Sequence, residues 1–366
     1  LPTGGACLQY SRQRGGAFSC FDPCEFKWQS DEAKALGKLR YLNCKLDVWR
    51  QDNFLRSCAQ VVAATGQRDV NAVRAVVIPE PSKFRIVTSG DGYLYSCLQP
   101  FQGFLLDQWK HRPESTMLRD DLTTRVREID GLSDLPYWCS VDYEAATDLL
   151  KRAATVGAVM HLRGLPGWEY AINSLFAGGL SYPDKTETRH IEGQLMGHPL
   201  SFPILCVINL AVYHRALDIW VEEDPSRRAL ALKVRKAVLV NGDDMLFKSD
   251  RRLYEIFLKV AADAGFKISV GKNYLSPDCA MINSQTFRRV AGRMERFGYL
   301  NLKLIKGFSL KTGESNALPT QIGREMNKLV SLCPWAKSAI PAVMQRYSKG
   351  KFRPNWYLPV HLGGYG

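Results

Sequence analysis

The chain has 366 residues, 46% of them hydrophobic and 11% aromatic, which is enough for a sizeable core and two or three substructures. Lys and Arg number 49 against 36 Asp and Glu, so the formal net charge of +13 indicates a polyanionic partner, nucleic acid or an acidic membrane surface. The longest apolar run, 202–213, is too short to cross a bilayer, which argues against a membrane-spanning segment.

The ten cysteines form no framework typical of a disulfide-rich domain. Cys20 and Cys24 stand four residues apart, but no second close pair or nearby histidine completes a zinc-ligand pattern. Free thiols in a reducing, intracellular compartment are therefore favoured over a structural zinc. The chain begins with Leu1 rather than Met and shows no signal peptide, so we expect a fragment or a processed piece of a longer protein.

Along the first half of the chain, about 75 mainly helical residues are followed by a strand over 72–81 that is broken by Pro79 and Pro81. The segment 137–162 predicts a strand that ends at Asp142 and a helix that begins near Glu144. Residues 193–200 read as a loop, and the next helix has Ser201 as its expected N-cap.

In the second half, Val238–Val240 and Met245–Phe247 predict two strands of a hairpin, because Asn241-Gly242 is a strong turn signal. A helix over 251–264, ended by Gly265, and a strand over 266–270 follow. This order predicts an α+β unit with helices on one face of an antiparallel sheet. At a strand end, Asp142 is then expected to face Asp243 and Asp244 across the sheet.

The adjacent carboxylates of Asp243 and Asp244 have two interpretations. One is a solvated turn, in which Asp is common. In a shielded site, however, two carboxylates ~4 Å apart repel by roughly 4 kcal/mol at an effective dielectric near 20, so a proton or a cation has to lie between them. Together with Asp142, they supply the hard oxygen ligands that two-metal phosphoryl transfer requires.

Four segments resemble motifs A, B, C and D of viral RNA-dependent RNA polymerases, in that order: CSVDYEAATD, GQLMGHPLSFP, VNGDDM and GFKISVGKN. In detail they are similar to the ourmia-like (botourmiavirus) branch, which is related to the levivirus and narnavirus replicases. The segment 79–103 is similar to motif F. Weaker similarity to motif E at YLNLKLIKG and to motif G at PTGGAC extends the resemblance over nearly the whole chain.

The resemblance implies an α+β right-hand polymerase, with fingers, palm and thumb and an antiparallel palm sheet backed by helices. It divides the chain into fingers (1–132), palm (133–155 and 191–300), a fingers insertion (156–190), and the remainder of motif E with a partial thumb (301–366). The implied activity is that of a viral replicase in the host cytoplasm, a nucleotidyltransferase that copies an RNA template from ribonucleoside triphosphates and releases pyrophosphate.

Carried onto the matching positions, the resemblance makes Asp142 and Asp243 ligands of two Mg²⁺ ions, with Mn²⁺ as the alternative ion and Asp244 as a weaker or outer-sphere ligand. Lys272 matches the motif D lysine, which protonates the pyrophosphate leaving group, and Lys267 is the alternative on the same segment.

For substrate binding, Lys83 and Arg85 alternate along a strand and are expected to grip the triphosphate. Asp148 is expected to reach the ribose 2′-hydroxyl. Gly193 and Gly197 are expected to let the motif B loop flex and approach the templating base pair.

Two further motif B positions are implied to bind substrate. Ser201 stands four residues after Gly197, where the family has Thr or Ser. The Asn that better-known polymerases carry four residues further on is replaced by Leu205, and Asn209 comes at eight. Asn209 therefore has two interpretations: it reads the ribose, or it is a buried helix residue satisfied by its neighbours.

Between residues 288 and 311, seven basic residues stand against Glu295 alone: Arg288, Arg289, Arg293, Arg296, Lys303, Lys306 and Lys311. With the aromatic residues among them, they predict a track for the RNA backbone, in which Arg288, Arg289 and Arg293 are the RNA-binding candidates. A solvated surface is the alternative.

Two other functions are compatible with part of the sequence. A reverse transcriptase shares the palm chemistry, but it typically has an aromatic residue before its Asp pair and a bulky aromatic residue that excludes the 2′-hydroxyl. Here Asn241-Gly242 precedes the pair, and Asp148 offers a hydrogen-bond acceptor. A non-catalytic RNA-binding protein would explain the charge but not the three acids.

Overall fold

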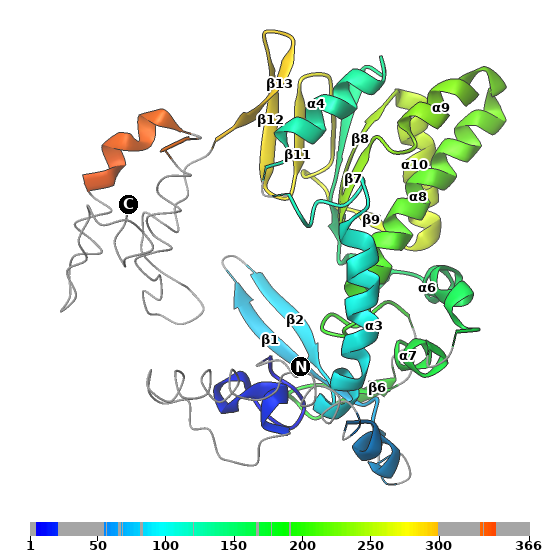
Figure 1. The fold of residues 1–366 in the computed structure, drawn as a ribbon, viewed down its shortest axis with the longest axis vertical. Helices are drawn as coiled ribbons and strands as arrows, with labels where there is room; N and C mark the ends of the chain where they lie inside the picture. Colours follow the sequence, from blue (N-terminus) through cyan, green and yellow to red (C-terminus); the bar gives the residue numbers. More distant parts are fainter. Residues whose placement is uncertain are drawn as a thin grey trace.

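The computed structural model describes residues 5–20, 55–298 and 330–341, apart from positions 56, 65–66, 68, 81–82, 120, 166–167, 177, 190–191 and 332. The motif E-like segment 299–307 and most of the predicted thumb, 301–366, lie outside the described residues. In Figure 1 the long helix α3 (Gly92–Lys110) runs between a larger group of strands and helices and a smaller group that contains the hairpin β1–β2.

The larger group is built on an antiparallel sheet with the strand order β10–β3–β8–β7. These strands span Tyr274–Ser276, Tyr137–Val141, Asp244–Ser249 and Val238–Asn241. Helices α8 (Ser201–Glu223) and α10 (Arg251–Ala264) lie together beside this sheet. The prediction of an antiparallel sheet backed by helices is therefore confirmed.

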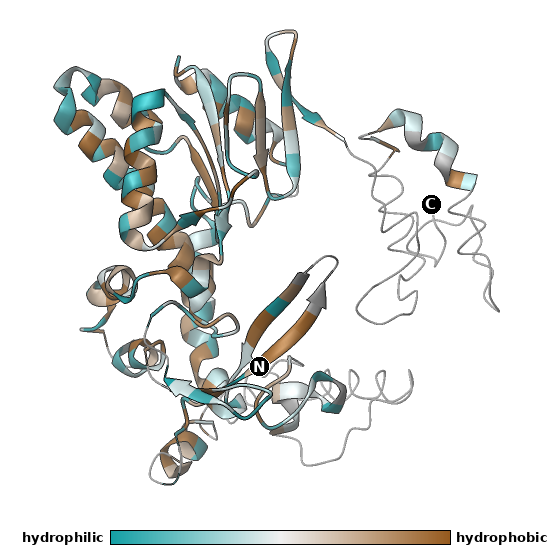
Figure 2. Ribbon diagram, turned by 180° about the vertical axis from the view of Figure 1, so that it is seen from behind, coloured by the Kyte–Doolittle hydropathy of each residue, from teal (hydrophilic) through white to brown (hydrophobic). Residues whose placement is uncertain are grey.

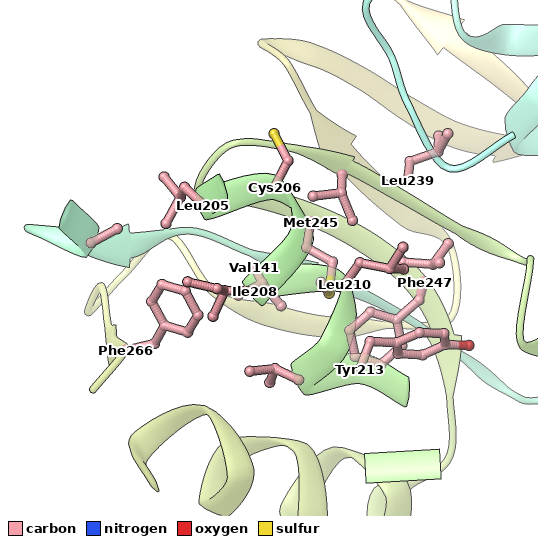
Figure 3. Packing of buried hydrophobic residues seen from close by; sticks show 14 of the residues in the cluster. Val141, Leu205, Cys206, Ile208, Leu210, Tyr213, Leu239, Met245, Phe247 and Phe266 are labelled. Carbon is pink, nitrogen blue, oxygen red and sulfur yellow. The ribbon is translucent and has the colours of Figure 1, made fainter. Parts of the chain in front are cut away.

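The core of this group lies between α8 and the sheet. Strand β3 contributes Val141 and strand β8 contributes Met245 and Phe247, and all three side chains are almost completely buried. Figure 3 shows them with side chains of α8 and the following segments: Leu205, Cys206, Ile208, Leu210, Tyr213, Leu239 and Phe266. At roughly 1.5–3 kcal/mol for each large apolar side chain, this burial fixes how the helix lies on the sheet.

Among the described residues, α8 is the one helix long and apolar enough to cross a membrane by length and composition. However, 61% of the most apolar 18-residue stretch of this helix is buried inside the protein, as in the core helix of a globular protein. Most of the remaining circumference is buried in the protein, because the exposed positions recur every three or four residues and form one stripe: Val207, Ala211, Arg215, Asp218 and Glu222. This helix is therefore weak support for a membrane span.

The smaller group holds a second sheet with the strand order β2–β1–β5–β6. Its strands span Lys83–Ser89, Val73–Glu80, Gly179–Ser181 and Glu187–Arg189. Contrary to the prediction, β1 continues through Pro79, which pairs with Phe84. Proline is tolerated there because β5 pairs only with Val73 and Arg74, so no described strand pairs with the other edge of β1 at Pro79.

The predicted single helix after Asp142 is wrong. The strand resumes as β4 (Tyr143–Glu144), because Tyr143 pairs with Ile268 of β9 (Lys267–Ile268). Ala145 then takes a left-handed φ of 48°, and the helix is divided into α5 (Ala146–Leu149) and α6 (Arg152–Val159) at the buried Leu150.

A third, smaller sheet consists of β11 (Cys279–Ile282), β12 (Gln285–Val290) and β13 (Arg293–Phe297). Further helices are α4 (Thr123–Leu132), α7 (Trp168–Ser174) and α9 (Arg228–Val234), and residues 57–64 are also helical. Short 3₁₀ helices span Arg12–Arg14, Gly16–Cys20, Met160–Leu162, Pro225–Arg227 and Pro334–Ala339.

Figure 2 shows apolar residues along the hairpin β1–β2 as well as in the core. Val77, Phe84 and Ile86 are 46%, 75% and 54% exposed. They occupy one face of the hairpin, since Val77 pairs with Ile86 and Phe84 lies two residues before Ile86. Arg85 lies on the opposite face.

Candidate active site

The two acids lie at the tip of the hairpin β7–β8. Asn241 pairs with Asp244, so Gly242 and Asp243 are the two central turn residues. Gly242 has a φ of 66°, which is the first-position glycine of a type II′ turn. The predicted hairpin is confirmed, but its turn lies one residue later than Asn241-Gly242, and Asn241 does not have a positive φ.

Asp142 meets this turn across the sheet. Strands β3 and β8 are antiparallel, and Val141 pairs with Met245. Asp142, the residue directly after β3, therefore lies beside Asp244. Asp142 and Asp244 line a cavity of about 230 Å³ together with Lys272 and the turn that joins β11 to β12. The prediction that Asp142 faces the acid pair across the sheet is confirmed.

The acids are close enough to influence one another's ionisation. Partial desolvation, and secondly the charge of Asp142, raise the pKa of Asp243, while the positive charges of Arg85 and Lys272 oppose that shift. Desolvation and the charges of Asp243 and Asp142 raise the pKa of Asp244 to about 6. Negative charge is thus concentrated here, which favours any cation that enters.

Of the two candidate lysines, Lys272 is the one at the acids. Its Nζ lies 3.1 Å from Asp142 Oδ2. Lys267 instead pairs with Glu144, 2.9 Å away, outside the cavity. An ammonium group therefore stands against the Asp142 carboxylate, on the segment that the sequence matched to motif D.

The segments that resemble motifs A, B and F are in direct contact. The Thr88 N–H and hydroxyl at the end of β2 both donate to Met196 O, at 2.6 and 3.0 Å. Gly197 has a φ of 126°, and a Cβ there would overlap Thr88 O. A Cβ on Gly193 would lie only 2.6 Å from Asp148 O. Glycine is therefore required at both positions, because the backbone of the loop lies too close to β2 and α5 for a side chain.

Two viral polymerases are similar to this chain in sequence. The chain is 31% identical over 255 residues to the RNA-dependent RNA polymerase of Ourmia melon virus, which covers 62% of this chain and 29% of that protein. It is 26% identical over 309 residues to the RNA-directed RNA polymerase of Saccharomyces 23S RNA narnavirus, over 77% of this chain and 31% of that one. The chain is related to these viral polymerases.

The chain spans less than a third of the length of these two relatives. Among solved structures, it resembles the RNA-dependent RNA polymerase of a human picobirnavirus, with a TM-score of 0.57 at 13% identity over 80% of this chain and 57% of that one. An insertion-loop deletion mutant of that enzyme gives a TM-score of 0.55 at 14% identity, over 80% and 59% of the two chains. The predicted right-hand polymerase fold is confirmed. No protein-family model matches the chain.

Within this fold, two of the predicted substrate-binding residues, Asn209 and Ser201, are buried. Asn209 is completely buried in α8; its Nδ2 donates to Gly242 O at 3.0 Å, and its Oδ1 accepts from the Tyr143 hydroxyl at 2.9 Å. Ser201 is also buried and donates to Leu195 O at 3.0 Å, and it is the first residue of α8 rather than its N-cap. Both residues hold neighbouring loops in place and do not line the cavity at Asp142 and Asp244.

Three other predicted contacts lie around the acids. Arg85 is exposed on β2, and its positive charge acts to lower the pKa of Asp243. Asp148 is exposed on α5, directly against the motif B loop at Gly193. Its position arises from the break after Asp142, not from a continuous helix. The backbone of Lys83 belongs to β2, where it pairs with Glu80, and its side chain lies outside the described part of the chain.

The predicted RNA-binding trio separates into two kinds of residue. Arg288 and Arg293 are exposed on β12 and β13. Arg289 is instead held by Asp130 of α4, which accepts from both of its Nη atoms at 2.8 Å. Lys248 Nζ lies 3.3 Å from the same carboxylate. Arg289 thus joins the small sheet to α4, and its guanidinium group is already engaged by the protein.

Two residues of this candidate site were missed by sequence reasoning. The N–H of Asp142 donates to Asn273 Oδ1 at 2.9 Å, although the only signal for Asn273 was its place next to Lys272. Asn283 lines the cavity in a turn where it and Ser284 have φ values of 50° and 57°. Asn adopts a positive φ more often than most residues, so Asn283 between two short strands was a weak signal for a turn.

Proposed function

We propose that the chain is the catalytic region of a viral RNA-dependent RNA polymerase, which copies an RNA template from ribonucleoside triphosphates. The observation that carries this proposal is the meeting of Asp142 with the Asp243-Asp244 turn across β3 and β8, with Lys272 against Asp142 and the charge of Arg85 within reach. The names of the two curated relatives and the polymerase fold support it.

The donor set at this site fits divalent cations. Asp142 and Asp244 line one cavity, and Asp243 adds a third carboxylate whose pKa is raised by partial desolvation and by the charge of Asp142. In the part of the chain that the structure describes, no group of three His, Cys, Asp or Glu residues is already assembled as a metal cluster. Asp142 and Asp243 would hold two Mg²⁺ ions, with Mn²⁺ as the alternative and Asp244 as a weaker or outer ligand.

When bound, such ions increase the acidity of the attacking 3′-hydroxyl and neutralise charge on the triphosphate. The protein's own groups bind and orient the reactants. Arg85 offers a planar fork to phosphate oxygens from the hairpin β1–β2, which Figure 1 shows reaching toward the β11–β13 side of the molecule. Lys272 holds a proton that can be passed to the pyrophosphate oxygen as it leaves.

Sugar selection is assigned to Asp148. It is exposed on α5, and its backbone is fixed by contact with Gly193 and by Gln194 N, which donates to Thr147 O at 2.6 Å. A carboxylate at this position would accept a hydrogen bond from the ribose 2′-hydroxyl. Arg288 and Arg293 are proposed to follow the RNA backbone, and the +13 net charge suits that partner.

The proposed division into subdomains is fingers (1–132), palm (133–155 and 191–300), a fingers insertion (156–190) and a partial thumb (301–366). The pairing of β1 with β5 supports the assignment of the insertion to the fingers, because it joins residues 73–74 to 180–181. The host cytoplasm is the proposed location, and it suits the eight described cysteines, all of which are free thiols.

The test is nucleotide addition to a primed RNA template, with ribonucleotides and deoxyribonucleotides supplied separately. The proposal predicts template-directed addition that requires a divalent cation and prefers ribonucleotides. A preference for deoxyribonucleotides would indicate a reverse transcriptase. RNA binding without any addition, in a chain shown to be folded, would indicate a non-catalytic RNA-binding protein.

A further inference from the structure

The strand that pairs with the Asp142 strand is interrupted opposite Asp142 itself. On one side β10 pairs with β3 as far as Tyr274 and Ser140. On the other side β9 pairs with β4, starting at Ile268 and Tyr143. Between β9 and β10, residues 269–273 leave the regular ladder and form a loop, so neither Val141 nor Asp142 has a paired residue on this edge among the described strands.

The side chain of Asn273 replaces the missing strand. Its Oδ1 accepts from the Asp142 N–H at 2.9 Å, and its Nδ2 donates to Asp142 O at 2.6 Å. One primary amide thus satisfies both backbone groups of Asp142, as the opposite residue of a ladder would. The Ser269 N–H adds a bond of 3.0 Å to the same Asp142 carbonyl from the other end of the loop.

Asn273 also closes the loop on itself. Its Nδ2 donates to Ser269 O at 2.8 Å, which joins the first residue of the loop to the last. The Lys272 N–H also donates to Ser269 O at 3.4 Å, whereas Val270 is 95% exposed and a Cβ on Gly271 would meet no atom of the described residues within 4 Å. Lys272, the residue before Asn273, extends from this loop to Asp142 Oδ2 at 3.1 Å.

We propose that Asn273 is a positioning residue that sets the Asp142 carboxylate and the Lys272 ammonium group in register, by pairing with the Asp142 peptide groups and closing the 269–273 loop. The inference rests on the proposed function for its catalytic consequence, but its structural part can be measured without activity. A side-chain amide is suited to this role because it donates and accepts in one plane and carries no charge beside the acids.

Amide hydrogen exchange tests the positioning directly. In Asn273→Ala, peptides that cover 139–144 and 269–273 should exchange at least tenfold faster, while peptides from α10 should keep the wild-type rate. Asn273→Asp keeps the size and one acceptor but loses both donated bonds, so it should resemble Asn273→Ala. The exposed Asn173 of α7 provides the matched control, Asn173→Ala, which should change neither segment. Wild-type exchange in both Asn273 variants would overturn the proposal.

Single-nucleotide addition tests the consequence. Since a displacement of about 1 Å can cost about 100-fold in rate, Asn273→Ala should lower kcat roughly 10- to 100-fold and change the KM for the nucleotide less than threefold. In a Lys272→Ala background the same substitution should cost at least threefold less, because the two residues act as a unit. Equal costs in both backgrounds would overturn the coupling. If the wild-type chain adds no nucleotide, the proposed function fails, and hydrogen exchange still decides the positioning.

Discussion

Asn209 links three parts of the proposed active site from a completely buried position. Its amide joins α8 to the Gly242 carbonyl in the acid turn and to the Tyr143 hydroxyl next to Asp142. The substitution Asn209→Leu keeps a side chain of similar size but removes both hydrogen bonds. It therefore leaves one buried hydroxyl and one buried carbonyl without a partner.

The structure gives the magnitude. A buried polar group left unpaired costs about 1–3 kcal/mol, so Asn209→Leu should destabilise the protein by about 2–5 kcal/mol. Adding Tyr143→Phe removes the unpaired hydroxyl and leaves only the Gly242 carbonyl unsatisfied. The double variant is thus expected to be more stable than Asn209→Leu alone, by about 1–2 kcal/mol.

Urea unfolding followed by intrinsic fluorescence measures this order. For a slope near 3 kcal/mol per molar, the midpoint of Asn209→Leu should fall by about 1 M, with part of the loss recovered in the double variant. Asn173→Leu on the exposed side of α7 is the control, and it should shift the midpoint very little.

Sugar discrimination separates this structural role from a direct contact with the ribose. Asn209→Leu should slow ribonucleotide and deoxyribonucleotide addition in proportion. Asp148→Ala should instead weaken ribonucleotide use and reduce discrimination by roughly 2- to 150-fold, the equivalent of about 0.5–3 kcal/mol. If Asn209→Leu relaxed sugar choice without loss of stability, and Asp148→Ala did not, the assignment of both residues would be refuted.

Three further predictions concern charged or titratable groups. Arg288→Ala with Arg293→Ala should flatten the log–log salt dependence of RNA affinity by about 1.4–1.8 units, at 0.7–0.9 per phosphate contact. Arg289→Ala should leave that slope nearly unchanged and instead lower the unfolding free energy by about 1–3 kcal/mol, because Asp130 loses its paired bonds. Equal slope changes for Arg288 and Arg289 would contradict this division. Burial lowers the pKa of His214, so the unfolded chain takes up its proton first and stability should fall as the pH drops below about 6.5. The free energy of unfolding of His214→Gln should fall less than that of the wild type between pH 7 and pH 5. An equal fall would show that His214 does not cause this pH dependence.

The acid hairpin was predictable from the sequence because all its determinants are local. Two apolar runs, one glycine and adjacent acids lie within ten residues, so turn chemistry alone gave β7, β8 and the position of the carboxylates near the tip. The exact turn was not predictable from the same signal. Asn241 was expected at the tip, whereas the pairing of Asn241 with Asp244 moves the turn to Gly242-Asp243.

Other features depend on partners far along the chain. Asn273 acts on Asp142, 131 residues away, and Arg289 acts on Asp130, 159 residues away. The direction of Asn209 depends on how α8 lies on the sheet, which is decided by packing. The break after Asp142 depends on the pairing of Tyr143 with Ile268, which overrides the helical pattern of 144–159. Periodicity carries no information about such contacts.

The central claim is that Asp142 and Asp243 are the acids of nucleotidyl transfer. The most direct measurement is the rate of ribonucleotide addition to a primed RNA template in Mg²⁺, made for Asp142→Asn, Asp243→Asn and Asp244→Asn together with their affinity for RNA. We expect the first two substitutions to slow addition by orders of magnitude, on the scale of about 10²-fold or more for lost transition-state charge stabilisation, with RNA affinity largely retained. Asp244→Asn should be milder. Near wild-type addition by Asp243→Asn in Mg²⁺ would contradict the account.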